Sequence, residues 1–260
     1  MNKKVWSIFP ALCLLVVSAL CALPSGAQMS DVKSKPPMYS YVANWQIPRA
    51  RWAEMSKDAS SERAILEKAL ADGTIVGYGN DVNLVHQADS ETHDSWFSAM
   101  SMAGLMKVLT QFYASPDSTS SARASATKHW DEVFVSRYYN WKPGSWKDAY
   151  VSVSSYKLKA DAPANAVDTL SKDVIVPVLE KLLTDGAIVE YDIDTQAVHT
   201  SAPGTFIIVY VAPQPDGLDK VDAAILDSMK TSPLSGPAFD SMIDSSAHRD
   251  ELLQGNGTFK

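Results

Sequence analysis

The chain carries two copies of one sequence unit. Residues 66–78 (LEKALADGTIVGY) match residues 179–191 (LEKLLTDGAIVEY), and residues 66–108 share 18 identities in 43 ungapped positions with the segment 113 residues further on. The matched polar residues include Asp81 with Asp194 and His86 with His199. Because a repeated sequence adopts a repeated fold, we expect the same supersecondary unit twice.

The match extends beyond this region with small changes in spacing, which are typical of insertions in loops. The flanking matches join Tyr39–Trp45 to Tyr150–Tyr156 and His129–Glu132 to His248–Glu251. The sequence therefore predicts two halves, residues 37–147 and 148–260, with the turn-forming tripeptide Lys142-Pro143-Gly144 near their junction.

Hydrophobic patterning predicts the same order of elements in both halves. Aromatic and β-branched residues predict strands at 39–47, 74–86 and, more weakly, 95–102, then at 187–199 and 205–212. Helical periodicity covers 61–71, with Gly73 as its cap, and 164–184, where Pro177 should kink or split the helix. We further expect helices from Leu105 and Leu218, a polar loop at 115–127, short helices at 129–135 and 248–253, and a terminal strand in each half.

This order, β-α-β-β-α-β, is the ferredoxin-like split βαβ arrangement, an antiparallel sheet with helices on one face. Two such units can place their bare faces against each other. In element order and duplication the sequence resembles the dimeric α/β-barrel (ferredoxin-like) superfamily, in the tandem form with both halves in one chain. The resemblance implies an α+β fold with two facing antiparallel sheets, and a cavity between or beside them where relatives bind small molecules.

The N-terminus has the three parts of a cleavable signal peptide. Lys3 and Lys4 precede an apolar run from Val5 to Leu23, and small residues then lead to a cleavage point after Ala27. Pro10 and the small-residue exit disfavour the competing interpretation, a permanent membrane anchor. We therefore expect residues 1–27 to be removed and the protein to be periplasmic or secreted.

Composition excludes several function classes for the mature chain. Both cysteines, Cys13 and Cys21, lie in the predicted signal peptide, so the mature chain would have no disulfide, thiol nucleophile or thiolate metal site. The formal charge of the full chain is −7, and loss of Lys3 and Lys4 makes it more negative. A chain this acidic has no electrostatic basis for binding nucleic acid or anionic membranes.

The histidines are the candidate catalytic residues, because histidine titrates near neutral pH. Two repeat-related pairs and the neighbouring acids make up the candidate set: His86, His129, Asp131, His199, His248 and Asp250. In the functional interpretation, His86 and His199 end strands and point between the sheets, and the acids orient His129 and His248. His93 lies in a polar stretch and would join His86 and His129 if only the first half carries a site.

Two alternatives explain the same residues. Two histidines with a carboxylate could hold a metal, although no recognised metal-binding spacing occurs. The histidines could instead be hydrogen-bonded struts, with the acids after His129 and His248 forming the first turn of a helix.

Aromatic residues gather at the end of the first half, as Trp130, Tyr138, Tyr139, Trp141 and Trp146. They could line a pocket for a flat or sugar-like ligand, or they could pack the junction between the halves. Gly77 and Gly79 lie inside a strand pattern and predict a bulge or a close approach of other groups.

Three functional hypotheses remain. The first is an exported protein that binds or acts on a small molecule in a cavity between the halves. The second is a non-catalytic envelope scaffold, and the third is a metal or haem binder that uses the paired histidines. The sequence identifies neither a cofactor nor a metal, and it leaves the catalytic activity and oligomeric state open.

Overall fold

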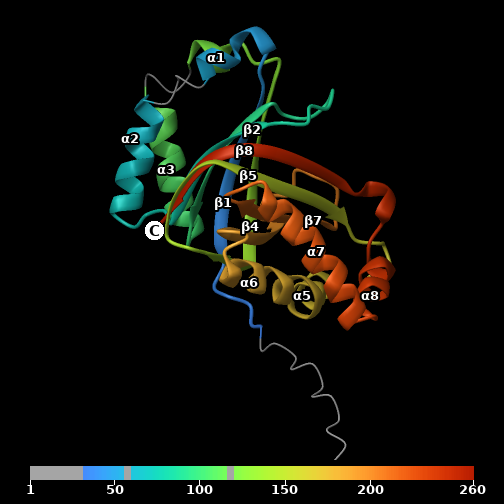
Figure 1. Ribbon diagram of the computed structural model, residues 1–260. Coiled ribbons are helices and arrows are strands. Elements are labelled where there is room, and N and C mark those ends of the chain that lie inside the picture. Colours follow the sequence, from blue (N-terminus) through green and yellow to red (C-terminus); the bar gives the residue numbers. More distant parts are fainter. Residues whose placement is uncertain (1–31, 56–59, 116–119) are drawn as a thin grey trace, which may run out of the picture.

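The computed structural model describes residues 32–55, 60–115 and 120–260, which form an antiparallel eight-stranded closed barrel with helices on its outside (Figure 1). The strands follow one another round the barrel in the order β1-β3-β2-β8-β5-β7-β6-β4, and β4 closes the ring by pairing with β1. The predicted signal peptide, residues 1–27, lies outside the described residues.

The elements of the first half are β1 (Met38–Gln46), η1 (Arg49–Arg51), α1 (Trp52–Met55), α2 (Ser60–Ala71), β2 (Gly77–Asn83), β3 (His93–Ala99), α3 (Met102–Ala114), α4 (Ser121–Ala124) and β4 (Lys128–Trp141). Those of the second half are β5 (Gly144–Lys157), α5 (Ala166–Leu170), the π-helical turn η2 (Ser171–Ile175), α6 (Val176–Asp185), β6 (Glu190–Gln196), β7 (Thr205–Ala212), α7 (Asp216–Thr231), α8 (Ser235–Met242), η3 (Ser245–Ala247) and β8 (Arg249–Phe259). The predicted boundary at 147/148 falls within β5, after the turn Lys142-Pro143.

The two halves use equivalent strand orders, β4-β1-β3-β2 and β8-β5-β7-β6. The predicted α+β fold with antiparallel strands is confirmed, and its two four-stranded parts form one closed sheet, because β2 pairs with β8 and β4 pairs with β6. The four-stranded sheets are thus joined at both edges into one barrel. Closure satisfies the backbone N–H and C=O groups that an open sheet edge would leave unpaired.

The predicted short helices at 129–135 and 248–253 were wrong, because these residues belong to β4 and β8. The histidine and the acids that follow it alternate across the barrel wall. His129 stacks on Trp45 outside the barrel, whereas Glu132 is hydrogen-bonded to Asn44 and Gln196. Successive side chains in this segment therefore point to opposite faces of a strand, whereas the acids had been expected to form the first turn of a helix.

Two helix ends follow the predicted chemistry. Gly73 (φ 77°) and Gly186 (φ 78°) are repeat-related and adopt the left-handed conformation that ends α2 and α6. Pro177 lies in the first turn of α6, directly after the π-helical turn η2 that separates α6 from α5. The predicted helix at 164–184 is therefore split, because proline provides no N–H for the preceding turn.

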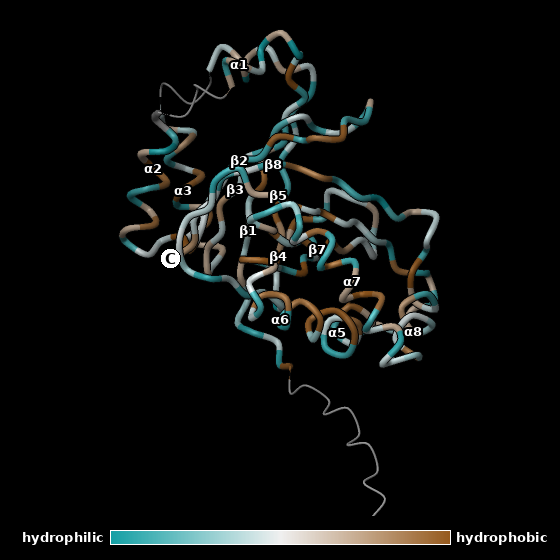
Figure 2. Tube along the Cα trace, viewed as in Figure 1, coloured by the Kyte–Doolittle hydropathy of each residue, from teal (hydrophilic) through white to brown (hydrophobic). Residues whose placement is uncertain are grey.

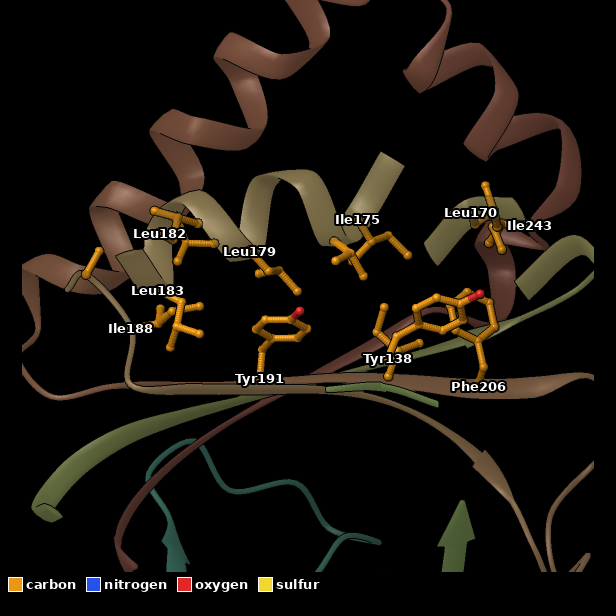
Figure 3. Packing of buried hydrophobic residues seen from close by; sticks show 14 residues of the cluster. Tyr138, Leu170, Ile175, Leu179, Leu182, Leu183, Ile188, Tyr191, Phe206 and Ile243 are labelled. Carbon is orange, nitrogen blue, oxygen red and sulfur yellow. The ribbon is translucent and has the colours of Figure 1, made fainter. Parts of the chain in front are cut away.

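Each half buries an apolar cluster between its sheet and its helices. In the cluster beneath α5 and α6, Tyr138 of β4 joins Tyr191 and Phe206 of the second half. These rings project from the barrel wall towards Leu179, Leu182 and Ile175 of the helical layer (Figure 3). Figure 2 shows apolar residues concentrated along α5 and α6, where the helices cover this sheet. In the first half, Phe97, Leu105 and Val108 belong to the equivalent cluster beneath α2 and α3. None of the described helices is both long and apolar enough to cross a bilayer.

Aromatic rings in the barrel interior pack directly against glycine residues of the strands. A Cβ atom built on Gly77 would lie 2.3 Å from Phe259, one on Gly79 would lie 2.6 Å from Trp96, and one on Gly257 would lie 2.3 Å from Trp146. These rings stack on one another, with centroids 5.4–6.2 Å apart. The pattern at Gly77 and Gly79 therefore marks a close approach of side chains.

Candidate ligand cavity

Five carboxyl groups lie inside the barrel, where strand alternation turns them away from the helices. They are Asp81 on β2, Asp94 on β3, and Glu190, Asp192 and Asp194 on β6, and each residue is at most 9% exposed. None of the ion pairs in the described part of the chain involves any of them. Buried carboxylates without cations are costly, so these groups favour their protonated forms.

The pKa values follow from this burial. Loss of solvation raises the pKa of Asp81 to about 6 and that of Asp194 to about 7. Hydrogen bonds oppose this rise, because the Trp96 indole donates to Asp81 (3.0 Å) and the Ser136 hydroxyl donates to Asp194. Burial and neighbouring carboxyls raise the pKa values of Asp94, Glu190 and Asp192 well above the ordinary range.

The acidic region continues towards the end of the barrel where β2 meets β3. Burial, a hydrogen bond to Glu91 and the charges of Glu91 and Glu132 raise the pKa of Glu251 to about 8. Burial also raises the pKa of Glu132. The interior acids were not predicted as a group. Two signals pointed to them: the repeat match of Asp81 with Asp194, and the alternation of acids along β6.

The paired histidines of β4 and β8 lie outside the barrel. His129 Nδ1 contacts the Asn44 carbonyl oxygen at 2.9 Å, and Nε2 lies 3.4 Å from Asp131. In the other half, His248 stacks on Tyr156 with 4.4 Å between ring centroids, and its Nε2 lies 3.1 Å from Asp250. Both histidines thus stack on an aromatic ring of the neighbouring strand and contact the acid two residues on.

The other predicted histidines do not enter the barrel. His86 and His199 are exposed in the loops that follow β2 and β6, which end before them. The edges of the His86 and His93 rings contact Trp52 outside the barrel, with centroids 4.8 and 5.0 Å away. The inward orientation expected for the paired histidines is therefore corrected, and their catalytic role stays a prediction. The described residues contain no group of three or more His, Cys, Asp or Glu placed to hold a metal ion.

A cavity of about 330 Å³ lies outside the barrel, where the N-terminal arm (residues 32–37) passes the second half. Its lining comes from the arm (Val32, Lys33, Lys35), from β4 and β6 (Tyr138, Tyr139, Tyr191), and from α6 (Val176, Glu180). The arm leaves the barrel beside α6 (Figure 1). Two hydrogen bonds hold it there, from Lys35 N to the Arg137 carbonyl (2.7 Å) and from the Tyr139 hydroxyl to the Pro36 carbonyl (2.9 Å).

Glu180 and Lys35, two charged residues that line the cavity, differ in the hydrogen bonds and contacts that their charged groups make. Glu180 Oε1 accepts hydrogen bonds from the Tyr191 hydroxyl (2.5 Å) and from Asn140 Nδ2 (2.8 Å). The Lys35 ammonium lies 5.1 Å from the centroid of the Tyr139 ring, and its pKa is lowered because burial outweighs the attraction of Glu180. The cavity therefore combines aromatic walls with a desolvated cation.

Sequence reasoning identified only part of this cavity. Tyr138 and Tyr139 belong to the aromatic group for which a pocket was one interpretation, whereas Trp141 and Trp146 stack on Phe259 at the barrel end. Tyr191 lies in the matched segment 179–191, and the match did not mark it as a cavity residue. The lysines of the arm precede the repeat and follow no pattern that would place them near α6.

Comparison with known proteins shows the fold. No family model and no curated protein matches the chain. Among solved structures, a "putative monooxygenase" from Lactobacillus acidophilus NCFM is similar at TM-score 0.57 and 12% identity, over 85% of this chain and 94% of that one. A "putative monooxygenase" from Fusobacterium nucleatum is similar at TM-score 0.58 and 10% identity, over 87% and 95%. An "anthrone oxidase-like protein" is similar at TM-score 0.52 and 10% identity, over 86% and 93%. These similarities show that the overall fold, an antiparallel closed barrel with helices on its outside, is shared with these structures.

Proposed function

We propose that this chain is an exported protein that binds a small molecule in the cavity between the N-terminal arm, β4, β6 and α6. The observation that carries the proposal is the cavity itself: about 330 Å³, with three tyrosines and charged groups converging on it. Concave sites of this size, mainly apolar with a few polar groups, are typical of small-molecule binding. The arm directly follows the predicted cleavage region, so processing would leave the site intact.

The fold supports a small-molecule function without identifying the molecule. The similar structures include proteins described as monooxygenases and as anthrone oxidase-like, names that refer to chemistry on small molecules. We further propose that the chain arose by tandem duplication and that the described part of the first half has no equivalent of the cavity beside Glu180 and Tyr191. The first half has Glu67 and Tyr78 at the positions of Glu180 and Tyr191, but its Glu67 pairs with Arg63 at 2.9 Å.

A cavity-filling variant tests this proposal. Val32→Trp should abolish binding of any ligand found by NMR screening of neutral, anionic and cationic one- and two-ring compounds, because the indole would occupy the cavity. Ser34→Trp is the matched control, since Ser34 is exposed on the same arm and does not line the cavity. The proposal is wrong if no compound binds, or if Val32→Trp binds as well as the wild type while circular dichroism shows both to be folded.

A further inference from the structure

We infer that the cavity takes a small organic anion with a flat apolar body, whose charged group contacts Lys35. This inference rests on the proposed function and adds the charge and shape of the ligand. It follows from which groups of the cavity already have partners and which do not.

Among the described residues, no carboxylate forms an ion pair with the Lys35 ammonium. No ion pair within 4.0 Å involves it in the part of the chain that the structure describes, and its side-chain contact is with the face of the Tyr139 ring. Lys35 is half-buried, so it has lost some of its water without gaining a counter-ion. A ligand anion would supply the missing charge-assisted hydrogen bond.

Glu180, the acid of the cavity, is engaged elsewhere. One of its oxygens accepts from both Tyr191 and Asn140, which links α6 to β6 and β4. These bonds stabilise the carboxylate where it is and make it a weaker attraction for a ligand cation. Of Glu180 and Lys35, only Lys35 has a charged group with no hydrogen bond or ion pair to another described residue.

The tyrosines offer a ligand their rings, because their hydroxyl groups already donate hydrogen bonds within the protein. The hydroxyl of Tyr138 donates to Asp168, that of Tyr139 to the Pro36 carbonyl, and that of Tyr191 to Glu180. With these donors used, the walls offer mainly aromatic carbon, together with the apolar side chains of Val32 and Val176. Such walls favour a flat apolar body, and about 330 Å³ suits one or two rings.

Three probes of the same shape test the charge preference: 2-naphthoate, neutral 2-naphthamide and cationic 2-naphthylmethylammonium. We expect calorimetry or NMR titration to show naphthoate binding at least about tenfold more tightly than naphthamide, and the ammonium compound most weakly. Lys35→Met keeps the length and apolar character of the side chain but removes the charge. It should lower naphthoate affinity to that of naphthamide and leave naphthamide affinity unchanged.

The outcomes separate this inference from the proposed function. If naphthamide or the ammonium compound binds at least as tightly as naphthoate, and Val32→Trp abolishes that binding, the cavity is a ligand site and the anion inference is overturned. The anion inference is also overturned if Lys35→Met leaves naphthoate affinity unchanged. If none of the three binds and the wider screen also yields no ligand, the proposed function fails together with the inference.

Discussion

The free energy of unfolding should decrease as the pH rises from 6.5 to 8.5, although most proteins are near their greatest stability there. The cause is the group of carboxyls inside the barrel. Asp194 has a pKa of about 7 and Glu251 of about 8, and the pKa values of Asp94, Glu190 and Asp192 are also raised well above the ordinary range.

The direction follows from proton linkage. In the unfolded chain these carboxyls ionise near pH 4, whereas in the barrel they keep their protons to higher pH. Their stabilising contribution is complete below the unfolded pKa and is lost as the pH rises through the folded pKa. Asp194 alone would account for about 1 kcal/mol between pH 6.5 and 8.5, and Glu251, whose pKa is about 8, for about 2 kcal/mol. His93 has the opposite effect, because burial lowers its pKa to about 4, but that loss of stability occurs below pH 6.5.

Urea unfolding at pH 6.5, 7.5 and 8.5 and constant ionic strength measures the effect. Asp94→Asn is the informative variant, because its amide can still donate to Asp81 but cannot ionise. It should reduce the dependence of the urea midpoint on pH and be more stable than the wild type at pH 8.5. A wild-type midpoint that rises with pH over this range would contradict the assignment of raised pKa values.

Gly257→Ala should lower the free energy of unfolding by about 1–3 kcal/mol, the usual cost of overpacking a well-filled interior. The new Cβ atom would lie 2.3 Å from the Trp146 ring, which stacks on both Trp96 and Phe259, so the ring would have to shift against its neighbours. Because the three rings contact one another, a shift of Trp146 should also change the tryptophan fluorescence of the folded protein.

Gly236→Ala provides the control. Gly236 lies in α8, and a Cβ atom there would meet nothing within 4 Å. Alanine is favoured over glycine in helices by up to about 1 kcal/mol, so this variant should be as stable as the wild type or slightly more stable. Equal urea midpoints for Gly257→Ala and the wild type would show that the aromatic stack is more deformable than the packing implies.

Local patterns predicted most elements of the fold. The matched segments at 66–78 and 179–191 each contain the end of a helix, a glycine in the left-handed conformation and the start of a strand. The helix predicted at 164–184 is split at Pro177. Residues 129–135 were assigned wrongly because acids after a histidine are equally typical of a helix start. Only the pairing of β4 with both β1 and β6 shows that they form a strand.

The features that local sequence patterns did not predict depend on contacts between residues far apart in the sequence. The pairing of β2 with β8 joins residues about 180 positions apart and has no signature in either strand. The paired histidines were predicted as a site because both copies kept them, but stacking of His129 on Trp45 and of His248 on Tyr156 accounts for their shared placement. The cavity depends on an arm outside the repeat, which no comparison of the two copies could locate.

The position of β8 between β2 and β5 affects how the chain can fold during synthesis. Its residues, Arg249–Phe259, leave the ribosome or a translocation channel after the other seven strands of the barrel. Until they arrive, β2 and β5 each keep an unpaired edge, and the acidic barrel interior remains open to water. A chain truncated before Arg249 should therefore resemble an open, aggregation-prone sheet. The barrel would therefore close only after β8 has been synthesised and has paired with both β2 and β5.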